Sequence, residues 1–241
     1  MKTKSILPLG IMFLGSLLVS CAQESPYNNQ DFSIETIQVT HEKDLGVTVW
    51  EIAVEGNAGN TVPVAAGQLD GAPVLGYVFP TNLSSSDVGF GNVDGIVALA
   101  LTSHPDFDDT PLWDENNDAD FANDGVVWHP HWVVLGEDKR VPGGLSVIQF
   151  QKTDDTVVLP PTNPGMPMYM DSPGYPVLTQ NKTIKVVVPD YRINNRSDFK
   201  YDGVTAFMQV NTSKENMPLL GVYDVFSVAS GDLSLPYSVK K

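Results

Sequence analysis

Carboxylates and imidazoles, the side chains that most often bind metal ions, are concentrated in one short stretch of this chain. Eight carboxylates lie within Asp106–Asp124. Three of the four histidines flank them: His104, His129 and His131. No Lys or Arg occurs between Lys43 and Lys139, so these acids lack cationic partners nearby in sequence. Unpaired carboxylates repel one another in a folded protein. Solvent or a bound cation relieves that repulsion, so the stretch indicates a metal site before it indicates any reaction.

Oxygen-bearing side chains stand at alternate positions of the segment Asp114-Glu115-Asn116-Asn117-Asp118-Ala119-Asp120. Calcium takes six to eight oxygen ligands, and alternate residues of a tight loop can all point inward. The segment resembles the calcium loops of EF-hand and dockerin-type proteins. This resemblance implies that Asp114, Asn116 and Asp118 are the first ligands, followed by the backbone carbonyl of Asp120.

The segment also departs from that family. Ala119 stands where the family has its turn glycine, and Gly125 stands where a bidentate acid closes the site. The flanking residues do not have a helical pattern. We therefore expect a calcium loop on a β scaffold. The ligand shell would be completed by Asp124 or by one of Asp106, Asp108 and Asp109. The alternative is a solvated acidic loop in which Asn and Asp form turns.

The histidines lie in a second segment, Trp128-His129-Pro130-His131-Trp132, which has the apolar character of a strand. Alternation places His129 and His131 on one strand face and the two tryptophans on the other. Two imidazoles on one face can share a transition metal, with His104 as a third ligand and an acid as a fourth. Pro130 has no backbone N–H to donate to a neighbouring strand, so we expect an edge or bulged strand and an accessible site.

The His-x-His-Trp spelling resembles the zinc strand of α-type carbonic anhydrases, which implies a zinc hydrolase or hydratase. In that family the third histidine follows the pair, whereas this chain has no histidine after His131. The alternative is that His129 and His131 are partly buried strand residues, hydrogen-bonded to nearby aspartates.

Two further groups of side chains have a functional and a structural interpretation. Met166, Met168 and Met170 alternate in the Pro-rich segment Pro160–Pro176, where thioethers would bind Cu(I) or fill gaps in the core. Three tryptophans would stack on sugar rings or lie in the interior: Trp113, Trp128 and Trp132.

The N-terminus has the features of an export signal. Lys2 and Lys4 precede an apolar run over 6–19, which is shorter than the stretch that a transmembrane helix needs. The run ends in Leu18-Val19-Ser20-Cys21, which resembles the lipobox of bacterial lipoproteins. The resemblance implies a signal peptide over 1–20 and a palmitate-type lipid on Cys21. It also implies a membrane anchor on the non-cytoplasmic side of the cell envelope. An ordinary secretory signal is the alternative.

The rest of the chain divides into a polar tether over 21–31 and one domain over 32–241. Loss of Lys2 and Lys4 with the signal takes the net charge from −15 to −17. That charge argues against a nucleic-acid partner. We expect a glycan or a protein as the ligand, with the membrane contacted through the lipid.

Strand-like segments rich in Val, Ile and aromatic residues alternate with clusters of Gly, Pro, Asn and Asp. This pattern predicts an all-β fold, a single antiparallel β-sandwich with two long loops, Ser103–Gly125 and Pro160–Pro176. The expected strands are Val47–Val54, Val74–Phe79, Gly95–Leu101, Val126–Leu135, Leu145–Phe150, Thr156–Leu159, Thr183–Val188, Val204–Val210 and Leu219–Val228.

No Gly-x-Ser-x-Gly motif or other nucleophile motif occurs in the sequence. The leading hypothesis is therefore a non-enzymatic binding or surface module stabilised by calcium. The alternative is a zinc- or copper-binding protein or metalloenzyme that uses His104, His129 and His131.

Overall fold

Antiparallel β-strands make up most of the regular structure, which confirms the all-β prediction. The computed structural model describes residues 25–110, 114, 119 and 124–241. Within these residues no helix has the length and apolar character needed to cross a bilayer. The strands are β1 (Ile34–Glu42), β2 (Val47–Val54), β3 (Pro73–Pro80), β4 (Ile96–Ser103), β5 (His129–Glu137), β6 (Leu145–Val147), β7 (Met170–Asp171), β8 (Val177–Gln180), β9 (Thr183–Pro189), β10 (Lys200–Tyr201), β11 (Val204–Val210), β12 (Leu220–Val228) and β13 (Tyr237–Ser238). Four short 3-10 helices complete the elements: η1 (Gln30–Phe32), η2 (Ser85–Val88), η3 (Asp124–Val126) and η4 (Asp190–Ile193).

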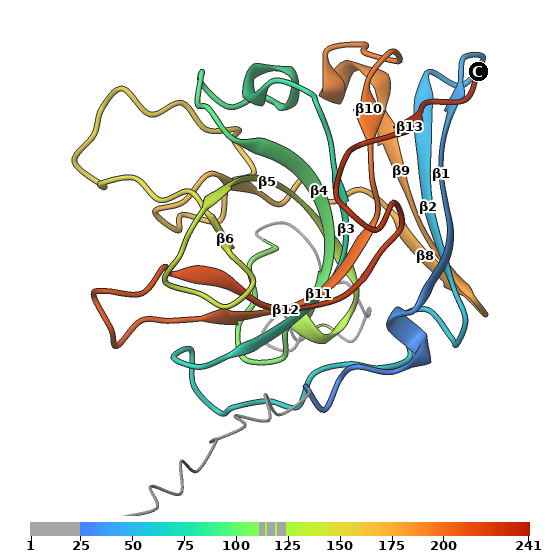
Figure 1. Ribbon diagram of the computed structural model, residues 1–241. Coiled ribbons are helices and arrows are strands. Elements are labelled where there is room, and N and C mark those ends of the chain that lie inside the picture. The colour runs from blue at the N-terminus through green and yellow to red at the C-terminus, as the bar shows by residue number, and fades with distance from the viewer. Residues whose placement is uncertain (1–24, 111–113, 115–118, 120–123) are drawn as a thin grey trace, which may run out of the picture.

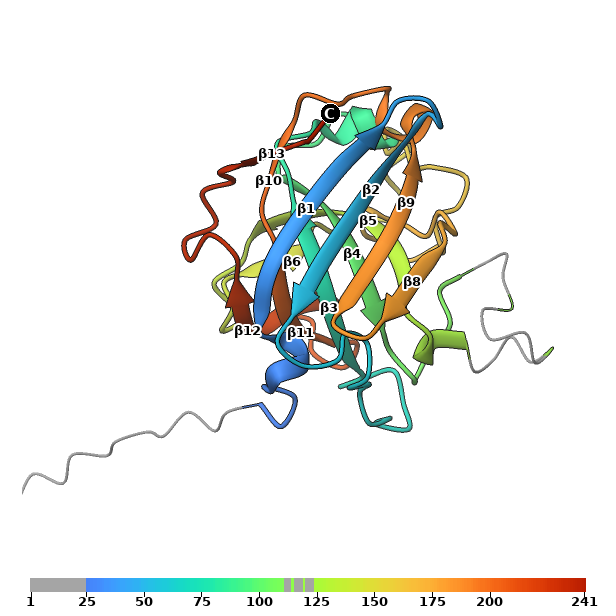
Figure 2. The same cartoon turned by 90° about the vertical axis from the view of Figure 1, so that its right-hand side faces the viewer.

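The strands form two layers, one of which closes on itself. The larger sheet has the order β4-β3-β11-β12-β6-β5-β7, and β4 also pairs with β5. Strands β3, β11, β12, β6, β5 and β4 therefore run around a ring, which is seen nearly end-on in Figure 1. The second sheet, β1-β2-β9-β8, packs against the side of this ring formed by β3, β4 and β5 (Figure 2).

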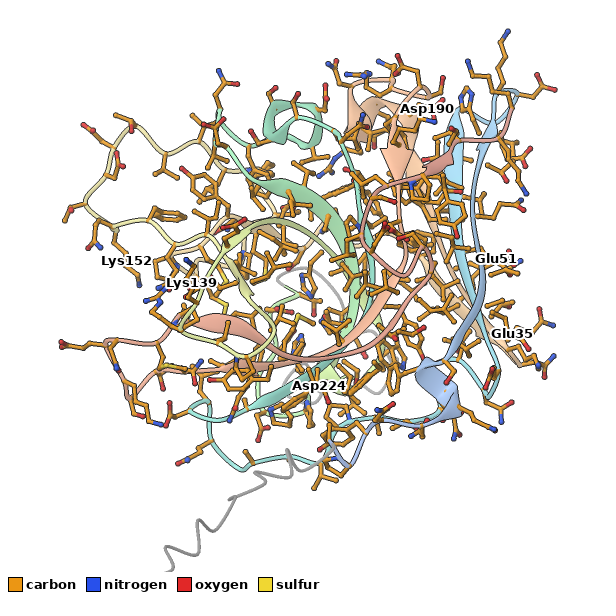
Figure 3. The ribbon with its side chains drawn as sticks, in the orientation of Figure 1. Glu35, Glu51, Lys139, Lys152, Asp190 and Asp224 are labelled. Atoms are coloured by element: carbon orange, nitrogen blue, oxygen red, sulfur yellow. The ribbon has the colours of Figure 1, made fainter. Side chains whose placement is uncertain are left out.

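Side-chain alternation gives the ring strands two apolar faces. On β3, Leu75 and Tyr77 belong to the core between the ring and the four-stranded sheet, whereas Val74 and Val78 belong to the core inside the ring. Strands buried on both faces read as nearly continuous apolar runs, which is why β3 and β4 were predictable from composition. The outer face of the four-stranded sheet is polar, and Glu35 and Glu51 point away from the ring there (Figure 3).

Aromatic side chains hold the two layers together. Trp50 on β2 is fully buried, stacks on Phe199 at 5.1 Å between ring centroids, and meets Phe79 and Trp132 edge-on. Its indole N–H donates to the Thr48 hydroxyl at 2.9 Å, so no polar group of this tryptophan is left unpaired.

The predicted strands agree best where burial is greatest. Val47–Val54 and Val204–Val210 coincide with β2 and β11. The prediction at Thr156–Leu159 is wrong, because the Asp154 carboxylate accepts from both the backbone N–H and the hydroxyl of Thr156 and forms a turn. Strand β1 was missed because only Val39 along it is fully buried.

The last residues of the segment predicted as a tether contact the domain. The Tyr27 ring lies 5.7 Å from that of Phe207, and its hydroxyl accepts from the backbone N–H of Val64. The Asp31 carboxylate accepts from the backbone N–H of Asn57. Residues 1–24, with Cys21, lie outside the described residues, so the signal and the lipid stay predictions from sequence.

Replacement of Trp50 by Ala should lower the free energy of unfolding by about 3–5 kcal/mol, because it removes the aromatic contacts between the layers and leaves a cavity there. Urea unfolding followed by fluorescence and circular dichroism measures this loss. The exposed Leu178 supplies the control, and Leu178→Ala should change stability by less than about 0.5 kcal/mol. A loss below about 1 kcal/mol for Trp50→Ala would show that the layers are held elsewhere.

Candidate metal centre

One end of the ring holds a buried cluster of four potential metal ligands. His104, Asp109, His129 and His131 are each 5 % exposed or less. One nitrogen or oxygen from each of them lies within 4.8 Å of all the others. Among the described residues, this group has the composition and spacing needed to hold a metal ion.

The pairing of β4 with β5 brings these residues together. In this antiparallel pair Thr102 lies opposite His129, and Ala100 lies opposite His131. His129 and His131 lie on the strand face that points into the ring, and Trp132 lies on the opposite face, as the alternation predicted. His104 directly follows β4, so it reaches the same end of the ring from the neighbouring strand.

The loop after β4 is fastened at both sides of His104. The backbone N–H of His104 donates to the carbonyl of Gly125 in η3, and the Ser103 hydroxyl donates to the carbonyl of Val126. A Cβ atom at Gly125 would lie 2.2 Å from the carbonyl oxygen of His104, so only glycine fits here. The sequence alone places His104 only in a loop near the histidine strand. These contacts fix it beside the start of β5.

The ring nitrogens of the three histidines converge on one carboxylate oxygen. The Oδ1 atom of Asp109 lies 3.1 Å from Nε2 of His129, 3.2 Å from Nε2 of His104 and 3.6 Å from Nε2 of His131. The Nε2 atoms of His104 and His129 are only 2.7 Å apart.

The opposite ring nitrogens have acceptors of their own. Nδ1 of His104 lies 2.8 Å from the carbonyl oxygen of Phe107, and Nδ1 of His129 lies 2.6 Å from that of Val127. A carbonyl only accepts, so both Nδ1 atoms carry the proton and donate it. In the neutral imidazoles, the two Nε2 atoms 2.7 Å apart then present lone pairs to each other. A shared proton or a metal cation between them removes this repulsion, and such outer hydrogen bonds are typical of metal-binding histidines.

Burial and charge set the protonation of the cluster. Burial lowers the pKa of His131 to about 3, although the nearby Asp109 carboxylate acts in the opposite direction. For Asp109, burial favours the neutral acid, but attraction to the imidazoles of His104 and His131 in their protonated forms, with the hydrogen bonds that His104 and His129 then donate, outweighs burial. The pKa of Asp109 is therefore held well below its usual range. A neutral His131 and an ionised Asp109 are the forms in which these side chains bind metals.

The other acids of the Asp106–Asp124 stretch have separate roles where the structure describes them. The Asp106 carboxylate accepts from the backbone N–H groups of Ala66 and Gly67, and the Asp108 carboxylate accepts from Thr110. The Asp114 carboxylate accepts from the backbone N–H of Ala119 at 2.7 Å. Most of the proposed calcium ligands, Asn116, Asp118 and Asp120 with the Asp124 side chain, lie outside the described residues, so the calcium loop stays a prediction.

Trp128 and Trp132 follow the structural one of their two interpretations, whereas the histidine strand is less accessible than expected. Trp128 and Trp132 are 8 % and 0 % exposed and belong to the core between the layers, which leaves neither indole open to a sugar ring. Trp113 lies outside the described residues. Pro130 lies where β5 pairs with β4 and before the β6 and β7 pairings begin, as a proline requires. The site is nevertheless buried, and Phe107 of the segment after β4 stacks on His104 with 4.0 Å between the ring centroids.

No protein-family model, curated protein or solved structure matches this chain. The interpretation of the site therefore depends on its own geometry.

In EDTA, acidification from about pH 6.5 to about pH 4 should lower the free energy of unfolding by about 3 kcal/mol through His131 alone. The pKa of His131 is lower in the folded state than in the unfolded chain, so the unfolded state takes up the proton first as pH falls. Stability is therefore full above about pH 6.5 and declines toward about pH 3. Urea unfolding across this range measures the slope.

The variant His131→Asn removes the group and should flatten this part of the profile. An unchanged slope in His131→Asn would assign the acid sensitivity to other residues.

Proposed function

We propose that the protein binds a transition metal ion, zinc foremost, through His104, His129, His131 and Asp109. The observation that carries the proposal is the 2.7 Å approach of two Nε2 atoms whose Nδ1 partners are both carbonyl oxygens. A cation with three imidazole ligands turns this repulsive contact into coordination.

The distances favour a tetrahedral ion. Zinc binds His nitrogen and carboxylate oxygen at about 2.0–2.2 Å, so neighbouring ligand atoms of a tetrahedron lie about 3.3 Å apart. The separations between the Asp109 oxygen and the three Nε2 atoms run from 3.1 to 3.6 Å. To complete the shell, the Nε2 atoms of His104 and His129 would have to separate from 2.7 Å to about 3.3 Å.

The ligand chemistry separates this site from a calcium site. Calcium prefers six to eight oxygen atoms, whereas this cluster offers three nitrogens and one carboxylate. Copper is the second candidate, because Met166, Met168 and Met170 line the same cavity as His131. Met168 and Met170 are packed among apolar side chains in the ring, which favours zinc with methionine as packing.

A zinc ion at this position would supply a Lewis acid, and it would lower the pKa of a water that entered its shell as a fifth ligand. The residues themselves prepare its site. Asp109 supplies the negative charge that offsets the cation, and the Nδ1 hydrogen bonds hold the imidazole rings in one orientation.

The sequence-based proposals concerning location and calcium are separate from this site. We infer a lipid anchor at Cys21 from the lipobox alone, which would hold the domain at a membrane outside the cytoplasm. Calcium binding at Asp114–Asp120 rests likewise on the spacing of oxygen ligands. Neither proposal depends on the histidine cluster.

Elemental analysis of protein purified without chelator or affinity metal tests the proposal. We expect about one zinc per chain, and at zinc concentrations near 100 times Kd a stabilisation of about 2.7 kcal/mol over the EDTA-treated protein. His129→Ala and His131→Ala should each lose the zinc, because a tetrahedral shell needs all its ligands.

His41 provides the matched control, because its imidazole pairs with Asp190 at 2.8 Å on the other sheet. His41→Ala should keep the zinc. Absence of a transition metal, or zinc retained by a His129→Ala, His131→Ala double variant, would refute the proposal. Calcium found in that double variant would support the separate loop instead.

A further inference from the structure

A cavity inside the ring adjoins the metal cluster. Its volume is about 140 Å³, and most of its wall is formed by apolar side chains of the ring strands and by methionines of the Pro160–Pro176 segment. His104, Asp109 and His131 also line it. The cavity is therefore apolar along its length and has metal-binding groups in one part of its wall.

The cavity exists because the inward-facing residues of several strands are small. Ala98 and Ala100 on β4 and Ala206 on β11 belong to the core inside the ring. Gly76 on β3 has no side chain, and the Met208 methyl group takes the space beside it, since a Cβ atom at Gly76 would lie 2.7 Å from that methyl group. Protein interiors are normally packed without voids of this size. A cavity of this size is therefore a candidate site for a bound ligand.

The volume limits the size of that occupant. An apolar cavity of about 150 Å³ binds one benzene molecule, so this one fits a single six-membered ring or a chain of about six carbons. The methionines in the wall can adjust to different shapes, since their side chains are unbranched and flexible.

Two buried polar atoms of the wall lack hydrogen-bond partners within the described part of the chain. They are the Thr102 hydroxyl oxygen and Nε2 of His131. Thr102 is 5 % exposed, lies opposite His129 in the β4–β5 pair, and precedes His104 by two residues. If His131 binds the metal, the Thr102 hydroxyl is the remaining unpaired group of the two, and it has a hydrogen to donate into the cavity. An unpaired buried hydroxyl costs about 1–3 kcal/mol, which a polar ligand atom would recover.

The charge of the loaded site selects an anion. A divalent ion with three neutral imidazoles and one carboxylate has a net charge of about +1. The cavity lining contains no Lys or Arg among the described residues, so the metal is its source of positive charge. A single carboxylate neutralises that charge in surroundings of low dielectric constant.

The cavity has an apolar opening. Ile96, Val225 and Leu233 all line it, and each is 37 or 38 % exposed. Leu233 and Leu235 adopt positive φ angles of 58° and 53°, which cost non-glycine residues conformational energy. That cost places two leucine side chains of the segment after β12 against the cavity. An apolar molecule can pass between these residues without crossing a charged rim.

We propose that the ring cavity binds a small apolar monocarboxylate. Its hydrocarbon part lies among the valines, alanines and methionines, and its carboxylate binds the metal as a fifth ligand and accepts a hydrogen bond from the Thr102 hydroxyl. The proposal deepens the function proposed above and rests on the metal site. It names the class of ligand that this site receives.

Cobalt-substituted protein, titrated with benzoate and hexanoate, tests the proposal. Four-coordinate Co²⁺ has a visible spectrum that changes when a carboxylate enters its shell. We expect one equivalent of benzoate to bind and to change that spectrum. Benzyl alcohol, which has the ring without the charge, should bind at least about 10-fold more weakly, a difference of about 1.4 kcal/mol.

Variants separate the two parts of the ligand site. Thr102→Val keeps the shape of the side chain and should weaken benzoate about 10-fold without changing the spectrum of the ligand-free cobalt protein. Ala206→Leu, or Val78→Phe if the first does not fold, should abolish benzoate binding while the cobalt remains bound. Ala53→Leu is the control, because Ala53 lies on the opposite face of β2 from the buried Trp50 and should bind benzoate normally.

The outcomes distinguish the two proposals. If the protein takes up no cobalt or zinc, the metal site and this inference both fail. If it takes up one ion that depends on His131, but neither carboxylate changes the spectrum at millimolar concentration, only the ligand proposal is overturned. Benzoate binding of equal strength in Ala206→Leu and Val78→Phe would place the ligand outside the ring and overturn it too.

Discussion

The hydrogen-bonded pairing of β4 with β5 is the interaction on which the rest of this structure depends. It runs from Ile96 opposite Leu135 to Thr102 opposite His129, and it closes the larger sheet into a ring. The same pairing places the end of β4 beside the start of β5, where the histidines lie. A slip of one residue would turn His129 and His131 toward the aromatic core and Trp132 into the ring. Ring closure, cavity and ligand cluster therefore share one register.

That register has an electrostatic cost that the cluster itself must offset. A carboxylate and three imidazoles are buried together at the end of an apolar space, and burial of charge is unfavourable unless it is paired. Asp109 faces all three Nε2 atoms, and Phe107, Val127 and Ser172 hold the three Nδ1 atoms. Each of the three imidazoles therefore has a neighbouring polar group at both of its ring nitrogens. The arrangement resembles a prepared coordination shell more than an incidental polar contact.

The sequence predicts some of this site and not the rest, for identifiable reasons. The alternation of His129 and His131 with Trp128 and Trp132 is local, so the pattern alone places the imidazoles on one strand face. The choice of Asp109 is not local. Eight carboxylates of similar type share that stretch, and only the path of the loop, fastened at Gly125, selects one of them. The cavity could not be predicted from the sequence either. A small residue such as Ala206 leaves an empty space only if the residues that face it are also small, and the sequence does not say which residues face it. Strand β1 was not predicted because most of its side chains are polar or only partly buried, although its backbone pairs with β2 along its length.

The burial of all four ligands also has a kinetic meaning. An ion held by these four residues would have two routes to bulk water: the ring cavity, whose opening is apolar, and the segment that is hydrogen-bonded at Gly125 and Val126. An apolar passage is unfavourable for a hydrated ion, so exchange should depend on local opening of that segment, and its rate should follow the free energy of opening. A competing chelator, however strong, would wait for the same event. A metal bound here would be acquired as the chain folds and kept for as long as that segment stays closed.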